Sequence, residues 1–125
     1  MFYPAEQISD QQERSIAAEM IREKVILLTE QELPYSTAVV IDRFEEDSGL
    51  NRIYATIFVD RESQKPIVVG RGGAMIKAIG TAARAELERE MERRIYLDLH
   101  VKVKAEWRDD DRLLDDIDKQ NRVAE

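Results

Sequence analysis

Four consecutive residues, Gly70-Arg71-Gly72-Gly73, combine features that suit the binding of a phosphate group. Glycines remove side-chain bulk, so the sugar-phosphate backbone of a ligand can approach the protein main chain closely. Arg71 adds a positive charge within the segment, and Lys65 and Lys77 flank it in the sequence. If a helix begins directly after the glycines, its free N–H groups and the positive end of its dipole strengthen this attraction. The segment therefore predicts a site for phosphates.

The charge of the whole chain limits what that site can bind. The 125 residues carry a net charge of −7, which excludes a protein that binds nucleic acid through overall basicity. The segment 61–80 is nevertheless net basic, because it holds four Lys and Arg residues and a single Glu. A local positive surface on an acidic body predicts selective binding of moderate strength.

The composition excludes several other classes of protein. The length predicts one domain with a core of its own. The absence of cysteine excludes a disulfide framework, a thiolate metal site and a cysteine nucleophile. No apolar run reaches membrane-spanning length, and the first residues lack the pattern of a signal peptide, so we expect a cytoplasmic protein.

Two helices are predicted on either side of the glycines. Ser63 is the expected N-cap of a short helix, and Pro66 falls within its first turn, where a missing N–H costs little. Gly70 is expected to end that helix by adopting a positive φ, and the next glycines reverse the chain. The second helix has apolar residues at the spacing of a buried face, at Met75, Ile76, Ile79, Ala83, Leu87 and Met91.

Three strands and two more helices are predicted elsewhere. A helix runs from Gln11 to about Glu32 and is ended by Leu33-Pro34. Strands 37–44 and 52–60 form a hairpin around a polar turn at 45–49. Strand 94–104 alternates apolar and polar side chains, as in a sheet with one packed face and one solvated face. A short acidic helix follows Trp107.

This order of elements predicts an α+β fold, in which a three-stranded sheet carries its helices on one face and all the apolar stripes meet between the layers. We expect residues 1–10 to form an N-terminal arm, residues 11–114 the domain, and residues 115–125 an acidic tail.

Other candidate sites have simpler interpretations. His100 has no cysteine or second histidine with which to bind a transition metal, so a solvent-facing strand residue is expected. The segment Asp109-Asp110-Asp111 lacks the ligand spacing of a calcium loop. Four glutamates interleave with arginines on one helix and predict an exposed, ion-paired face: Glu86, Glu88, Glu90 and Glu92. We therefore predict no catalytic residue, no metal site and no cofactor.

The glycine segment, set between the two central helices in this order of elements, resembles the G-x-x-G loop of type II KH domains, which holds about four nucleotides of single-stranded RNA. A more specific resemblance, from about residue 2 to about residue 114, is to the C-terminal KH domain of the Era family of ribosome-assembly GTPases. It rests on the segments AEMIREK (18–24), ELPYS (32–36), ATIFV (55–59), ESQK (62–65), VKVK (101–104) and WRDD (107–110).

This resemblance implies that the chain binds single-stranded RNA near the 3′ end of small-subunit (16S) ribosomal RNA. It also implies the small ribosomal subunit and an N-terminal GTPase domain as partners and, from the family alone, a peripheral association with membranes. No G-x-x-x-x-G-K-[ST] segment occurs, so the chain by itself is not expected to be an enzyme, and residues 1–10 are expected to be the remnant of an interdomain linker. Pro66 stands where the family more often has glycine, which should stiffen the short helix.

Two functions remain open at this point. The first is RNA binding, with phosphates at Gly70-Arg71-Gly72-Gly73 and bases in an adjacent apolar groove. The second is a protein-interaction module that keeps the fold and has lost RNA binding. For the first, the expected RNA-binding residues are Lys65, Ile67, Val68, Val69, Gly70, Arg71, Gly72, Gly73, Ala74, Met75 and Lys77.

Overall fold

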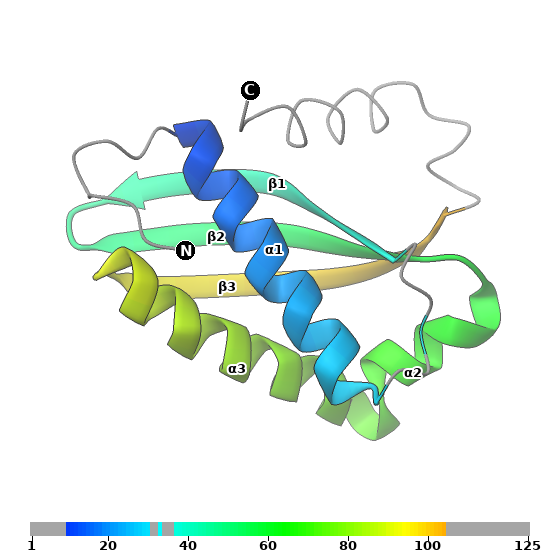
Figure 1. Cartoon of the computed structure of the whole chain (residues 1–125). Coiled ribbons are helices and arrows are strands. Elements are labelled where there is room, and N and C mark those ends of the chain that lie inside the picture. Colours follow the sequence, from blue (N-terminus) through cyan, green and yellow to red (C-terminus); the bar gives the residue numbers. More distant parts are fainter. Residues whose placement is uncertain (1–9, 31–32, 34–36, 105–125) are drawn as a thin grey trace.

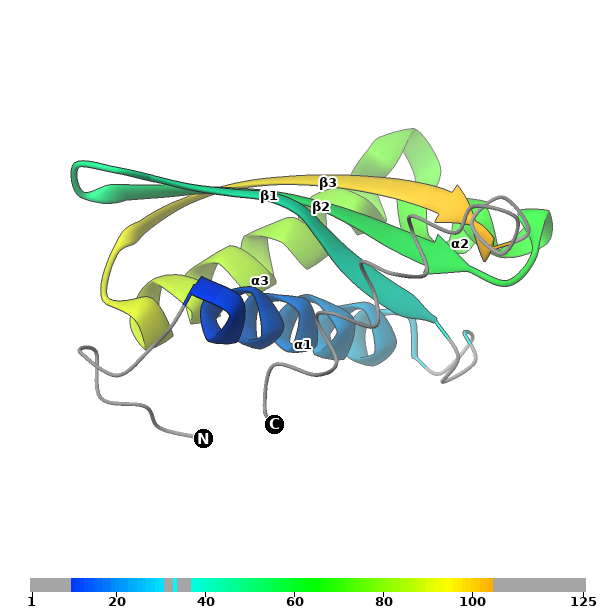
Figure 2. The same cartoon turned by 90° about the horizontal axis from the view of Figure 1, so that it is seen from above.

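A computed structural model describes residues 10–30, 33 and 37–104. Along the chain the elements are α1 (Asp10–Leu28), β1 (Ala38–Asp47), β2 (Leu50–Val59), a 3₁₀ turn (Glu62–Gln64), α2 (Lys65–Val69), a second 3₁₀ turn (Arg71–Gly73), α3 (Ala74–Met91) and β3 (Arg94–Val103). The predicted α+β fold, with a three-stranded sheet and its helices on one face, is confirmed (Figures 1 and 2).

The sheet has the order β1-β2-β3. β1 and β2 are antiparallel, whereas β2 and β3 are parallel, with Leu50 opposite Arg94 and Val59 opposite Val103. A parallel pair requires a long crossover connection, and here residues 60–93 supply it. That crossover contains α2, the glycine turn and α3, so the pairing of the strands places these elements beside the sheet.

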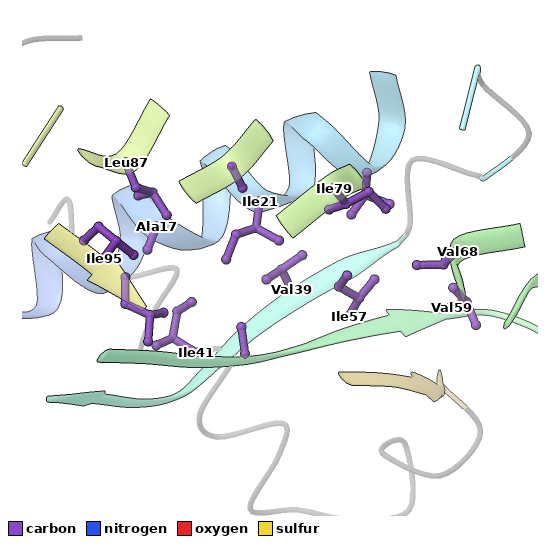
Figure 3. Close-up of a cluster of buried hydrophobic side chains, with 14 of the residues drawn as sticks. Ala17, Ile21, Val39, Ile41, Ile57, Val59, Val68, Ile79, Leu87 and Ile95 are labelled. Carbon is purple, nitrogen blue, oxygen red and sulfur yellow. The ribbon is translucent and has the colours of Figure 1, made fainter. Parts of the chain in front are cut away.

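The core lies between the sheet and the two long helices (Figure 3). Ala17 and Ile21 of α1 and Ile79 of α3 are fully buried, and they face Ile57 and other apolar side chains of the strands (Figure 3). The predicted helical stripe is largely confirmed, because Ile79, Ala83 and Leu87 are buried and two methionines pack against the core.

An ion pair joins the two helices at their surface. Lys24 of α1 lies 2.6 Å from a carboxylate oxygen of Glu86 on α3. The hydrogen bond to Glu86 raises the pKa of Lys24 above its ordinary value, since it favours the charged amine. The sequence predicts that the glutamates of α3 pair with arginines of the same helix, and for two of them this is wrong. Glu86 pairs with Lys24 of α1, and Glu88 accepts a hydrogen bond from the main-chain N–H of Ile95 at 2.9 Å.

The hairpin turn is tighter than the sequence predicts. The segment expected to turn at 45–49 continues β1 to Asp47, and only residues 48–49 lie between the strands. Two interactions keep Asp47 in the sheet: its carboxylate lies 3.0 Å from Arg52, and its carbonyl accepts a hydrogen bond from Arg93 at 2.7 Å. Gly49 has a φ of 78°, a left-handed conformation that glycine adopts with little strain.

The first helix is shorter than predicted. It ends at Leu28 rather than near Glu32. The Thr29 hydroxyl donates a hydrogen bond to the Val25 carbonyl at 2.7 Å, and Glu30 takes a φ of 54°, which is not helical. The helix therefore stops before Leu33-Pro34, and the proline is not what ends it.

The opposite face of the sheet is only partly solvated. Tyr96, His100 and Lys102 of β3 are exposed, as the alternation predicts. Val40 and Phe58 are buried on this face, so the expectation of a fully open face is wrong at that end of the sheet. The arm at 1–10, Trp107, the acidic triplet at 109–111, the following helix and the tail at 115–125 lie outside the described residues.

The contribution of the core can be measured with two substitutions on α1. Ile21→Ala is expected to lower the free energy of unfolding by about 2–5 kcal/mol, because it leaves a cavity at a fully buried position. Leu27→Ala on the same helix removes a side chain that is 60% exposed and is expected to cost less than about 1 kcal/mol. Urea denaturation would measure the free energy of unfolding of both variants. Equal losses of stability would contradict a core that lies under Ile21 and not under Leu27.

Candidate functional site

The glycine segment joins α2 to α3 through a sharp change in direction. The Gly70 N–H donates to the Pro66 carbonyl at 2.7 Å and closes α2, after which Gly70 takes φ 76° and ψ 172°. Gly72 and Gly73 have φ values of 62° and 82°, and α3 begins directly after them. The prediction that these glycines end one helix and open the next is confirmed.

Two local predictions about α2 have different outcomes. Pro66 lies in the first turn of α2, as predicted. Ser63 is not its N-cap, because residues 62–64 form a 3₁₀ turn that precedes α2. That turn is closed by Gln64, whose side-chain oxygen accepts a hydrogen bond from the Arg61 N–H at 3.0 Å.

Gly70 is also required by its surroundings. A Cβ atom at this position would lie 2.6 Å from both the Cβ and the main-chain nitrogen of Met75, which is closer than real Cβ contacts come. At Gly72 and Gly73 a Cβ would meet no atom within 4 Å. The first glycine therefore allows the two helices to approach each other, and the other two leave open space at the tip of the turn.

The cations near the turn are available to a ligand. Arg71, Gly72 and Lys77 are exposed, and Lys65 is partly exposed. Within the described part of the chain, no ion pair involves Lys65, Arg71 or Lys77. The N-terminus of α3 lies at the same place and adds the positive end of its dipole. An anion at this turn would meet positive charge that is not already neutralised.

An open hollow lies between the first half of α3 and β3. Its volume is about 340 Å³. Ile76 and Gly80 of α3 and Leu97 and Leu99 of β3 contribute apolar surface, while the other lining residues are Lys77, Thr81 and Arg84. This opening, the first hollow, therefore combines apolar residues with the cations Lys77 and Arg84, and Lys77 lies one turn into α3 from the glycine turn.

The structure changes part of the expected groove. Val68 is fully buried beside Val59 in the core, so its side chain cannot line an open groove and that prediction is wrong (Figure 3). Ile67 and Met75 are partly buried against the core, Val69 is partly exposed, and Ala74 is exposed at the start of α3. The alternation of strand 94–104 also predicts an outward, solvated Lys104, and this is wrong, because its amine is buried and lies 3.2 Å from Asp60.

Sequence reasoning missed the β3 side of the site. Leu97 and Leu99 were expected only as core-facing residues, and Thr81 and Arg84 were not singled out for binding. The β3 leucines lie close to Thr81 and Arg84 of α3 because β3 pairs in parallel with β2 at the edge of the sheet, beside α3. The alternation of strand 94–104 shows which side chains face the helices, but only the strand order shows that they border an opening.

The free edge of β3 offers main-chain groups to a ligand. In the described residues β3 pairs with β2 alone, so the N–H and C=O groups on its other side have no strand partner. These groups run along the first hollow and can donate and accept hydrogen bonds. The site therefore combines positive charge, an apolar surface and a row of main-chain donors and acceptors.

The described residues were also searched for a metal site and for a membrane-spanning helix. His100 is exposed and lies 3.3 Å from Asp98, which confirms its expected place on the solvent-facing side of the strand. No group of three His, Cys, Asp or Glu residues suited to a metal ion occurs there. Within the same residues, none of the helices combines the length and the apolar character needed to cross a membrane.

Comparison with known proteins gives consistent results. Residues 32–108 match a family model described as "KH domain". The chain is similar to "GTPase Era" of Syntrophus aciditrophicus (strain SB), with 50% identity over 115 residues, and to "GTPase Era" of Thermotoga maritima, with 50% identity over 111 residues. These alignments cover 90% and 88% of this chain but only 38% and 37% of the relatives. The chain thus spans about two fifths of the length of these curated relatives.

Two solved structures share the fold. The chain resembles a variant of Aquifex aeolicus Era bound to GDP.AlF4−, with a TM-score of 0.74, 40% identity, and coverage of 90% of this chain and 38% of that one. It also resembles Era in complex with MgGDPNP and nucleotides 1506–1542 of 16S ribosomal RNA, with a TM-score of 0.74, 39% identity, and coverage of 92% and 39%.

The different roles of the glycines can be tested by stability measurements. Gly72→Ala is expected to cost about 1–2 kcal/mol, because a side chain is strained at φ 62° but meets no neighbouring atom. Gly70→Ala is expected to cost clearly more, since its Cβ would overlap Met75 as well as being strained. Urea denaturation of both variants gives the comparison. A Gly70→Ala variant no less stable than Gly72→Ala would contradict the close approach of the two helices.

Proposed function

The chain belongs to the KH domain family, and from that premise we propose that it binds single-stranded RNA through the glycine turn and the first hollow. The single observation that carries this proposal is the position of the hollow. An opening of about 340 Å³, with both apolar and basic residues in its lining, lies between the first half of α3, the helix that begins at the glycine turn, and β3, an edge strand among the described residues. Phosphates and bases of one strand need these two kinds of surface next to each other.

The phosphates would be held at the turn. Arg71 can donate charge-assisted hydrogen bonds, and Lys65 and Lys77 add positive charge beside it. The bare main chain at Gly72 and Gly73 lets a phosphate approach the N-terminus of α3. Gly70-Arg71-Gly72-Gly73 and both lysines therefore keep the roles expected from the sequence, as proposals.

The bases would lie in the first hollow. Ile76, Leu97 and Leu99 offer van der Waals surface, and Gly80 lines the opening without a side chain of its own. The main-chain groups on the free edge of β3 can read the Watson–Crick edges of the bases. Ile67, Val69, Ala74 and Met75 border the turn and are kept as supporting contacts, whereas the side chain of Val68 is excluded by its burial.

The proposed target is the 3′ end of small-subunit ribosomal RNA. One similar structure is of Era bound to nucleotides 1506–1542 of 16S ribosomal RNA, and the resemblance in the sequence implies the same end of the molecule. The small ribosomal subunit and a GTPase domain are proposed as partners, with the cytoplasm as the location. A protein-interaction module without RNA binding is the competing function, and the open, unpaired cations at the turn favour RNA.

Replacing Arg71 and Gly72 with aspartates is expected to lower RNA affinity by roughly tenfold or more, since one charge-assisted contact of about 1.5–3 kcal/mol is lost and repulsion is added. The fold should survive, because both positions are exposed and aspartate tolerates a positive φ. The matched control is Ala85→Asp with Arg89→Asp, which makes the same change in charge at exposed positions on α3. Fluorescence anisotropy with a labelled oligonucleotide, together with circular dichroism, measures both effects.

An unchanged affinity in the folded aspartate variant would remove the turn as the phosphate site. If the control variant loses as much affinity as the turn variant, the effect belongs to the overall charge of the protein. The competing protein-interaction function predicts that wild type and both variants fail to bind RNA alike.

The strand state of the RNA provides a second test. The Watson–Crick edges are hidden in a duplex, so we expect clear preference for a single strand over the same strand annealed to its complement. The first hollow should also distinguish sequences, so a scrambled oligonucleotide should bind more weakly than the 3′ end of 16S ribosomal RNA. Titrations of the three RNAs at one salt concentration make the comparison. Equal affinities for the three RNAs would mean that generic electrostatic attraction is the whole of the binding.

A further inference from the structure

Gly80 differs from the other glycines of the chain. Of the five glycines, Gly49, Gly70, Gly72 and Gly73 have positive φ values, so the path of the main chain accounts for each of them. Gly80 lies inside the helix α3 and is not among the residues with a positive φ. The path of the main chain therefore does not require a glycine at this position.

The packing of α3 does not require a glycine at position 80 either. Among the described residues, a Cβ atom at Gly80 would meet only Cδ1 of Leu99, at 3.7 Å, which is an ordinary van der Waals distance. At Gly70, by contrast, the corresponding atom would lie 2.6 Å from Met75. A methyl group therefore fits at position 80 between α3 and β3, whereas it does not fit at position 70.

A glycine inside a helix makes the protein less stable than an alanine would. Glycine loses more conformational freedom on folding, and this effect acts through the unfolded chain as well as through the helix. Alanine is frequent in the same part of α3, at Ala78, Ala82, Ala83 and Ala85. The fold by itself thus favours alanine at position 80, and neither the main chain nor the packing accounts for the glycine.

Gly80 lies in the middle of the side of α3 that lines the first hollow. Ile76 and Lys77 line the hollow about one turn before it, and Arg84 lines the hollow one turn after it. Leu99, the side chain that a Cβ at Gly80 would contact, belongs to the lining on β3. A methyl group at position 80 would therefore lie between the two walls of the hollow.

We propose that Gly80 is a determinant of RNA affinity, because one base in the first hollow packs against the bare main chain of α3 at this residue. A flat base gains dispersion energy only where its atoms come into close contact, and a methyl group on α3 would hold it away. This inference rests on the proposed function, since it assigns to one residue the space that a base needs in the same hollow. It predicts that one substitution stabilises the protein and weakens RNA binding.

The test is the variant Gly80→Ala. Its melting temperature is expected to rise by about 4 °C, because alanine is the better helix former. Its affinity for a single strand of the 3′ end of 16S ribosomal RNA is expected to fall by about tenfold, because the methyl group overpacks the contact with the base. Thermal denaturation followed by circular dichroism and fluorescence anisotropy with the labelled RNA measure the two effects.

The matched control is Ala85→Gly, the reverse exchange at an exposed position of α3 outside the first hollow. Its melting temperature should fall by about 4 °C, and its affinity for the RNA should stay unchanged. The pair of variants therefore separates stability from binding, because the more stable protein is expected to be the weaker binder.

A second measurement identifies the base that meets Gly80. Oligonucleotides that each lack the base of one nucleotide are titrated into the wild type and into Gly80→Ala. At one position, removal of the base should abolish the difference in affinity between the two proteins, because the group that the methyl displaces is already gone. With the other oligonucleotides the difference should persist.

A Gly80→Ala variant that binds the RNA as tightly as the wild type would overturn the inference and leave the proposed function intact. A variant less stable than the wild type would also overturn it, since the fold itself would then require the glycine. A difference in affinity that persists with every oligonucleotide of the series would show that no base packs at Gly80. If the wild type binds none of the RNAs, the proposed function fails and the inference fails with it.

Discussion

The connection between α2 and α3 depends on a backbone path that glycine alone follows at low cost. Gly70 combines a positive φ with an extended ψ and lies so close to Met75 that no side chain fits between them. This close approach sets the direction in which α3 leaves the turn. Since α3 forms one wall of the first hollow, the position of this hollow beside β3 depends on the close approach at Gly70. The exposed tip at Arg71 and Gly72 contributes little to the fold and is free to serve binding.

Much of the fold could be predicted from the sequence because its patterns are local. The alternation in strand 94–104 and the helical spacing of Ile79, Ala83 and Leu87 each identify a buried face without knowledge of the partner. The glycine turn was also recognisable, since three positive φ values within four residues can be met by glycine with little strain. The phosphate half of the candidate site was therefore visible before the structure.

The rest depends on contacts between distant residues. Asp47 remains in its strand because Arg52 and Arg93 bind it, although its own polarity suggests a turn. Val68 is apolar beside a binding loop, and only the packing of α2 shows that it belongs to the core. The β3 wall of the first hollow follows from a parallel register that pairs residues more than forty positions apart, which no local pattern encodes.

The connectivity of the sheet has a consequence for the order of folding. The β1–β2 hairpin closes over two residues, and such local contacts form early because they cost little chain entropy. Strand β3 can join only after residues 60–93 have crossed over, and it is also the last of these elements to emerge during synthesis. A chain without β3 in place lacks the first hollow, because Leu97 and Leu99 of β3 form one of its walls. The candidate site is therefore completed late in folding, when β3 joins the hairpin.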